Sequence, residues 1–429
     1  MIPRIRMTWV HVRDSLWFLP TLLTLFSAAL AAAITTAERR GLLLTSPESA
    51  WAFGGGAEGA RGVLNVISGS LITVTGVVFS VTIVALQLAS VQFTPRVLRN
   101  FTADRANQVV LGVFIGTFTY TLLVLRTVDS GNTPGDVFVP RVAVTLSVVL
   151  VLVSIGFLIF FINHAARSIQ VATILWRVTR ETVGHIRQLF PGRLAHDAPA
   201  PLPHPKPAGT PALVAAPRSG YLQAVDAKGL SRLARARKMV IRMELQIGDF
   251  ALPGQPLASV WPPDALDAAT AKQIVAGFIV GMERTPEQDV EFGIIEIADI
   301  AVKALSPAIN DPTTALRCID HLSEILLELA RSAPLYDRME GEGVFIARYT
   351  TFERAVGLAF DQIRHNGAEN PTITKKLLST FRDLRELVPE AHRAALAEQK
   401  DSFVEAAHSD IDNPVDLAAV DEAVERLSD

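Results

Sequence analysis

The sequence is short of cysteine and of charge. A single cysteine, Cys318, occurs in 429 residues, which excludes an intramolecular disulfide framework and a cysteine-rich metal site. Lys, Arg, Asp and Glu make up 19% of the chain, whereas a soluble globular chain carries about 25%. The net charge of −3 provides no overall basic field for nucleic acid. With a mean hydropathy of +0.31, the composition favours a membrane protein over an ordinary soluble enzyme.

Catalytic motifs are lacking as well. No Gly-rich phosphate loop precedes a lysine, and neither His-Glu-x-x-His nor Gly-x-Ser-x-Gly occurs in the chain. The histidines are scattered, and Cys318 has only Arg317 as a basic neighbour in the sequence. The sequence therefore predicts no enzymatic activity and no cofactor.

Long apolar segments fill the first 163 residues, and a helix needs roughly 20 apolar residues to cross a bilayer. Four such segments lie at about 16–37, 63–91, 109–125 and 137–162. We therefore predict a transmembrane domain over residues 1–190 with four spans. A cleaved signal peptide is the alternative for the first segment, because small residues gather at Ala29–Ala33. The length of that apolar run favours a span.

The arginines in the loops predict the orientation of these spans, because cytoplasmic loops are enriched in Lys and Arg. Eleven arginines lie in the three regions that would share one side: Arg4, Arg6, Arg13, Arg96, Arg99, Arg105, Arg167, Arg177, Arg180, Arg187 and Arg193. Five lie in the regions on the opposite side: Arg39, Arg40, Arg61, Arg126 and Arg141. The bias predicts a multi-pass membrane protein, in contact with the lipid bilayer, with both termini in the cytoplasm.

The second half of the chain has a different organisation. Residues 191–217 contain eight prolines and are predicted to form a linker. Residues 218–262 are predicted to be a small β-rich unit, because apolar and polar residues alternate over 239–247. Residues 263–429 are predicted to be a helical cytoplasmic domain. The expected fold class is therefore membrane, mainly α, with four transmembrane helices and a cytoplasmic α+β domain.

Individual helices can be placed within the last region. We expect helices over residues 267–281, 290–305 and 312–330. Asp311 is predicted to be an N-cap, because Pro312 follows it at a first helical position. Further helices are expected to follow from about residue 351 to near the end of the chain.

The second span carries small and polar residues at alternating steps of four and three, which places them on one helical face. They are Gly69, Thr73, Gly76, Ser80, Ile83, Gln87 and Ser90. In one interpretation Thr73, Ser80 and Gln87 line a pore around the axis of a homo-oligomer and face a small ion or solute. In the other, the small residues let neighbouring helices pack closely, as Gly112 and Gly116 would in the third span.

Two basic regions are candidates for contact with lipid. Arg96, Arg99 and Arg105 follow the second span and could form an electrostatic gate or a headgroup site, but anchoring at the cytoplasmic surface is the simpler explanation. A second basic run covers residues 228–242. It fits binding to anionic headgroups or simply a solvated surface.

Acidic residues provide the candidate metal site. Glu296, Asp299 and Asp311 could bind a divalent cation through oxygen ligands, although their spacing matches no EF-hand loop. The alternative is structural, since Asp311 is predicted to cap a helix and Glu296 can pair with a nearby Lys or Arg.

Three stretches carry a resemblance to known proteins: Phe93–Phe101 with Leu111–Phe118, Ala304–Ala315 with its Ser-Pro-Ala-Ile-Asn-Asp-Pro motif, and Ala359–Arg364 with Gly367–Pro371. In these stretches the chain resembles a family of bacterial integral-membrane proteins with a domain of unknown function. The resemblance implies four spans and a cytoplasmic C-terminal domain. It supplies no catalytic or binding residues.

Two functions remain open at this point. The polar stripe, the absence of charge deep in the spans and the lack of enzyme motifs favour an oligomeric channel with a regulatory cytoplasmic domain. The alternative is a non-conducting membrane anchor whose second half binds a ligand or a partner. A lipid-modifying enzyme is a third option and would need a pocket of perturbed acids around Glu296, Asp299 and Asp311.

Overall fold

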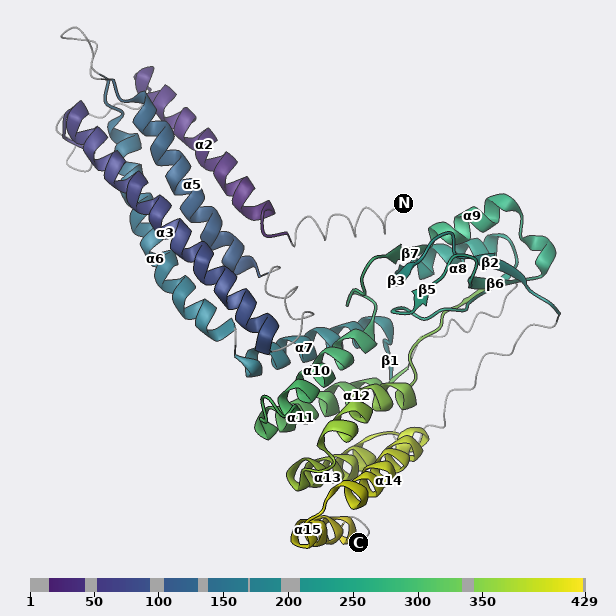
Figure 1. The fold of residues 1–429 in the computed structure, drawn as a ribbon. Coiled ribbons are helices and arrows are strands. Elements are labelled where there is room, and N and C mark those ends of the chain that lie inside the picture. The colour runs from purple at the N-terminus through teal and green to yellow at the C-terminus, as the bar shows by residue number, and fades with distance from the viewer. Residues whose placement is uncertain are drawn as a thin grey trace. The chain divides into compact units, whose positions relative to one another are not determined.

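The computed structural model describes residues 15–42, 52–92, 104–129, 138–168, 170–193, 209–333 and 343–426. The chain divides into two compact units, residues 1–170 and 171–429. The first contains long apolar helices, and the second contains both strands and helices (Figure 1). This arrangement confirms the predicted fold class of four candidate membrane helices followed by an α+β domain.

Four helices make up the first unit: α2 (Phe18–Arg39), α3 (Ala57–Gln92), α5 (Arg105–Thr127) and α6 (Arg141–Ser168). All four are long and apolar enough to cross a membrane. The four helices coincide with the four predicted spans, with ends that differ by at most six residues. The fourth helix begins at Arg141, directly after Pro140. Proline has a fixed φ and no backbone N–H, so it is tolerated at the start of a helix and not inside one.

Helix α5 is the most enclosed of the four. Half of its most apolar stretch is buried, compared with 17% for α2 and 22% for α3 and α6. Two glycines on α5 permit close contact with α2. A Cβ atom at Gly112 would lie 2.6 Å from Leu23 Cδ1, and one at Gly116 would lie 2.7 Å from Ser27 Oγ. These two glycines therefore pack helix against helix, as predicted for the third span.

Several polar groups inside the first unit are paired with one another, which lowers the cost of burying them where water is excluded. The hydroxyls of Thr117 and Ser154 lie 3.2 Å apart and join α5 to α6. The Glu38 carboxylate at the end of α2 accepts hydrogen bonds from the backbone N–H groups of Val142 and Ala143, at 2.8 and 3.1 Å. Glu38 therefore satisfies the free amides at the start of α6.

The second unit begins with α7 (Val171–Leu189), although residues up to 190 were assigned to the membrane domain from the sequence. One face of α7 is buried and contacts α10 (Val290–Leu305) and α11 (Pro312–Ala330). A Cβ atom at Gly293 would lie 1.9 Å from Thr182 Oγ1. Glycine is therefore required where α10 crosses α7, and this contact explains why α7 belongs to the second unit.

Two small sheets follow α7, and all their strand pairs except β4 with β9 are antiparallel. The first has the strand order β2 (Ala212–Ala215), β6 (Pro256–Trp261), β4 (Val240–Met243) and β9 (Val344–Ile346). The second has the order β5 (Phe250–Ala251), β3 (Gly220–Val225) and β7 (Phe278–Gly281). The helices α8 (Ala227–Ala236) and α9 (Ala268–Ala276) connect strands and cover a shared apolar core.

Three of these strands correct the sequence-based boundaries. Strand β2 lies inside the predicted linker 191–217, and β9 comes from far beyond the predicted β unit. Strand β7 occupies the end of the helix predicted over 267–281. The helix stops at Gly277, and residues 278–281 alternate between buried and half-buried positions as they pair with β3.

The remaining helices form the last part of the chain. They are α10, α11, α12 (Phe352–Gly367), α13 (Pro371–Leu387), α14 (Arg393–Asp410) and α15 (Pro414–Glu425). Two short strands, β1 (Gly192–Arg193) and β8 (Ser332–Ala333), pair beside them. Asp311 caps α11 by accepting from the Thr314 N–H, which confirms the predicted cap. The Ser-Pro-Ala-Ile-Asn-Asp-Pro segment is thus the turn between α10 and α11, in which Asn310 has a φ of 47°.

Candidate functional site

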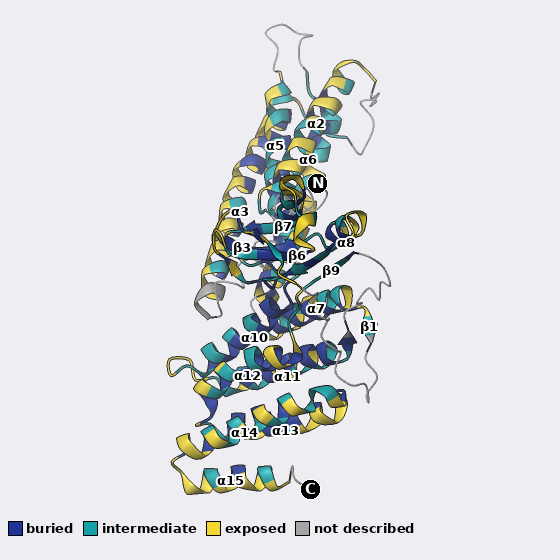
Figure 2. Ribbon diagram, turned by 90° about the vertical axis from the view of Figure 1, so that its right-hand side faces the viewer, coloured by how far each residue is buried: buried dark blue, intermediate teal, exposed yellow. Residues whose placement is uncertain are grey.

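Polar residues on α3 lie on the outer surface of the first unit. Figure 2 shows exposed residues along much of this helix. The exposed set includes six residues of the predicted stripe, which we call the α3 stripe: Gly69, Thr73, Gly76, Ser80, Ile83 and Gln87. The side chain of Ser90, the seventh, lies outside the described residues. The buried side of α3 includes Leu64, Leu71, Val78 and Ala85. At 3.6 residues per turn the two sets lie on opposite sides of the helix, so the α3 stripe points away from its own bundle.

The glycines of the α3 stripe have open space around them. A Cβ atom at Gly69 or Gly76 would meet nothing within 4 Å, in contrast to Gly112 and Gly116 on α5. The Thr73 hydroxyl donates to the Gly69 carbonyl of its own helix at 3.0 Å. Within the part of the first unit that the structure describes, the α3 stripe therefore packs against no other helix.

Of the predicted gate arginines, Arg96 and Arg99 lie outside the described residues. Arg105 is the exposed first residue of α5. Next to it, Asp104 caps α5 by accepting from the Ala106 N–H at 2.9 Å, and its other oxygen lies 2.8 Å from His164 Nε2. This Asp104–His164 contact joins the start of α5 to the end of α6 and was not predicted from the sequence.

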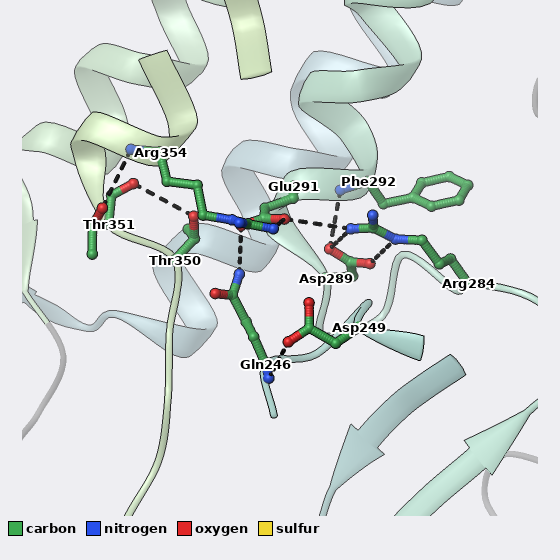
Figure 3. Close-up of polar contacts among 9 residues, drawn as sticks. All are labelled: Gln246, Asp249, Arg284, Asp289, Glu291, Phe292, Thr350, Thr351 and Arg354. Carbon is green, nitrogen blue, oxygen red and sulfur yellow. Dashed lines mark hydrogen bonds and ion pairs between the residues drawn. The ribbon is translucent and has the colours of Figure 1, made fainter. Parts of the chain in front are cut away.

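A cluster of buried charges lies in the second unit at the start of α10 (Figure 3). Asp289 and Glu291 are only 3% and 2% exposed. Arg284 binds the Asp289 carboxylate with two bonds of 2.8 Å. Arg354 binds Glu291 at 2.6 and 3.2 Å, and the Gln246 amide donates to Glu291 at 2.5 Å. We call these five residues the α10 charge cluster.

Local structure explains why these acids lie at the start of α10. Asp289 is the N-cap of the helix and accepts from the Phe292 N–H at 3.1 Å. Both carboxylates lie in or beside the first turn, where the free N–H groups and the helix dipole favour negative charge. Neither cation is on α10, because Arg284 lies between β7 and α10 and Arg354 is in the first turn of α12. With Gln246, which is 45 residues before Glu291, the cluster joins three separate segments.

The environment shifts the pKa of each acid differently. Burial raises the pKa of the Asp289 carboxyl by more than its partner Arg284 lowers it. Burial also acts to raise the pKa of Glu291, but hydrogen bonds from Arg354, Thr350 and Gln246 outweigh it, and the net pKa is lowered. Glu291 is therefore held as a buried anion by three donors.

The pocket next to this cluster is small, with an empty volume of about 250 Å³ that includes open solvent. It is lined by the end of α7, the loop before β5, the start of α10 and residues 348–350. The oxygen atoms of Glu291 are already engaged by protein donors. The arrangement acts as a structural clamp between segments, and it presents no free nucleophile or base.

The predicted metal residues are not brought together as a binding site. Glu296 is buried in α10, and Asp299 lies half-buried on the same helix. Asp311 uses both carboxylate oxygens to accept from Thr314, from its N–H at 3.1 Å and from its hydroxyl at 2.6 Å. Among the described residues, no group of three His, Cys, Asp or Glu side chains could hold a metal ion.

Sequence reasoning missed the partners in the α10 charge cluster. Asp289 and Glu291 are close neighbours in the sequence, but Arg354 follows 63 residues after Glu291. An Asp directly before an apolar helix, with Glu two residues later, is a helix-start signal. That signal indicates where the acids lie, and it does not indicate which arginines neutralise them.

These features define a class of protein, a multi-pass α-helical membrane protein with a large α+β domain after its last span. The chain belongs to the family described as "Predicted membrane protein (DUF2254)", whose model matches residues 13–383. It is 36% identical to the uncharacterized protein Rv1290c of Mycobacterium tuberculosis and, equally, to Mb1321c of Mycobacterium bovis. Each alignment covers 98% of this chain and 81% of the relative. No solved structure matches the chain.

Proposed function

We propose that the chain forms a homo-oligomer in the bacterial inner membrane and that copies of α3 surround a pore for a small ion or solute. The observation that carries this proposal is the exposed α3 stripe, which points away from the rest of its own bundle. Polar side chains in a membrane normally face protein or water. A second copy of α3 would supply the protein surface, and a water-filled pore axis would supply the water.

The chemistry of the stripe supports a passive pathway. Thr73, Ser80 and Gln87 offer hydroxyl and amide groups, and none of them carries charge. Such groups can replace part of the hydration shell of a passing ion without trapping it. A pump would be expected to hold an ionisable residue within its spans. The proposal assigns no catalytic step and no cofactor to the second unit, which would instead regulate the pore.

The orientation is part of the same proposal. The excess of arginine in the N-terminal arm, in the loop after α3 and after α6 supports a cytoplasmic location for both termini. The second unit would then lie in the cytoplasm, where it can meet a regulatory ligand or partner.

Disulfide cross-linking tests whether α3 helices meet. A Ser80→Cys variant, oxidised in membranes, is expected to give a covalent dimer, because Ser80 would face its copies across the axis. Val81→Cys is the matched control, since Val81 is also exposed, at 43%, but lies a third of a turn away from Ser80. The natural Cys318 can stay in place because it is fully buried.

The outcomes separate the two candidate functions. Efficient dimer formation at residue 80 with little at residue 81 supports the pore. Equal cross-linking at both positions, or none at either, contradicts it. The second unit would then be the functional part of a non-conducting, membrane-anchored sensor.

A further inference from the structure

Positive charge is concentrated on α8 and on the residues that follow it. Residues 227–243 contain six Lys and Arg side chains and no Asp or Glu, within a chain whose net charge is −3. Five of the six are exposed and form what we call the basic face: Lys228, Arg232, Arg235, Arg237 and Lys238. This segment lies within the second unit, between β3 and β4.

The geometry of α8 gathers three of these charges on one side. Lys228, Arg232 and Arg235 are separated by four and then three residues, so they project from the same face of the helix. The opposite face buries Leu230 and Ala234, which are 2% and 0% exposed. The basic face therefore points outward because the other side of α8 is fixed in the apolar core.

Two cations of this face have no acidic partner among the described residues. Within the described part of the chain, no ion pair joins Lys228 or Arg232 to an acidic side chain. Arg237 lies 3.4 Å from Asp267, but both side chains are about half exposed, at 45% and 55%. Such an exposed pair contributes little.

The helix dipole explains only part of the pattern. Cations near the end of α8, such as Arg235 and Arg237, are favoured there. Lys228 lies in the first turn, two residues after the N-cap Asp226, where the dipole disfavours a positive charge. The helix dipole therefore does not explain the positive charge of Lys228.

We propose that this basic face binds the anionic phospholipid headgroups of the membrane that the chain itself spans. Charge complementarity supports a polyanionic surface as the partner. Connectivity identifies that surface, because α6 ends at Ser168 and α7 begins at Val171. The second unit is thus tethered to the bilayer, which raises its effective concentration at the headgroups. The inference rests on the proposed location of the second unit in the cytoplasm, since the cytoplasmic leaflet of the membrane carries the negative surface potential.

Lysine acetylation of the full-length chain in nanodiscs tests this inference without any substitution. Nanodiscs of phosphatidylcholine alone are compared with nanodiscs that also contain phosphatidylglycerol. Acetylation of Lys228 is expected to be about fivefold slower with phosphatidylglycerol, as for a basic residue held at an anionic surface. The exposed Lys375 on α13 serves as the internal control and should react equally in both lipids. High salt should abolish the difference because it screens surface charge.

A pair of matched variants identifies the residues responsible. In Arg232→Glu/Arg235→Glu, the slower acetylation of Lys228 in phosphatidylglycerol should disappear. In Arg382→Glu/Arg385→Glu, which changes two exposed arginines on α13, it should remain. An unreactive Cys318 thiol in both variants shows that the second unit is still folded, because this side chain is fully buried.

Two results would overturn the inference. One is equal acetylation of Lys228 in both lipids. The other is protection of Lys228 by an added oligonucleotide but not by phosphatidylglycerol, which would make the basic face a nucleic-acid surface. Neither result depends on cross-linking at residue 80, so failure here is distinguishable from failure of the proposed pore.

Discussion

Replacing Arg354 with methionine is expected to destabilise the second unit by about 3 kcal/mol, because it leaves a buried anion without its main cation. Glu291 is 2% exposed, and its carboxylate accepts two hydrogen bonds from Arg354. The rate at which a thiol reagent labels Cys318 reports the loss, since Cys318 is the single cysteine and is fully buried. A loss of this size increases the population of the opened state more than a hundredfold.

Arg382→Met is the matched control for this prediction. The Arg382 side chain is 48% exposed, close to the 51% of Arg354, but its partner Asp383 is 59% exposed whereas the Glu291 side chain is 3% exposed. An exposed pair is worth about 0–1 kcal/mol, so labelling of Cys318 should barely change. Similar losses of stability in Arg354→Met and Arg382→Met would contradict the claim that burial of the acidic partner determines the cost.

The cost of Arg354→Met is also expected to depend on pH. In the native chain the pKa of Glu291 is lowered, so its stabilising contribution is present at neutral pH and is lost as pH falls through that lowered pKa. Without Arg354, burial dominates and raises the pKa, so the variant accepts a proton at higher pH. The difference in stability between the two chains should therefore shrink as the pH falls from 7 through about 4.3, the ordinary glutamate range.

Gln87→Leu is expected to have the largest effect on conduction. If Gln87 faces the axis, each subunit loses an amide that water or an ion can contact, and the constriction becomes apolar. Loss of such a contact costs about 1–3 kcal/mol. A barrier higher by that amount lowers the current by about fivefold to a hundredfold. The measurement is the current through a planar bilayer in KCl that contains the full-length chain.

Val81→Leu is the control for conduction, because it changes an exposed apolar residue of α3 outside the stripe. Its current should match that of the unsubstituted chain. A Gln87→Leu chain that conducts as well as the Val81→Leu chain would show that Gln87 does not line a pathway.

The spans could be predicted from the sequence because length and hydropathy alone determine whether a helix can cross a bilayer. The partners of each helix could not. Gly69 and Gly76 are seven residues apart and Gly112 and Gly116 are four apart, so each pair lies on one face of its helix. The first pair nevertheless faces open space, whereas the second packs against α2. Small residues permit close approach, and they do not specify which helix approaches.

The second unit shows the same limit. Asp311 was predicted as a cap because a cap is a local feature, formed with the Thr314 N–H three residues away. Strand β7 was mistaken for the end of a helix, because four apolar residues fit either structure until β3 pairs with them. Arg354 and Glu291 are joined through folding and not through spacing, so the α10 charge cluster had no sequence signature.

The oligomeric state in nanodiscs tests the central claim most directly. The claim is that the α3 stripe is exposed in one chain because copies of the chain cover it. Native mass measurement should find an assembly of three or more subunits of 46.4 kDa, and a map of that assembly should place α3 at the shared axis. A monomer, or an assembly with α3 on its outer surface, would contradict the account.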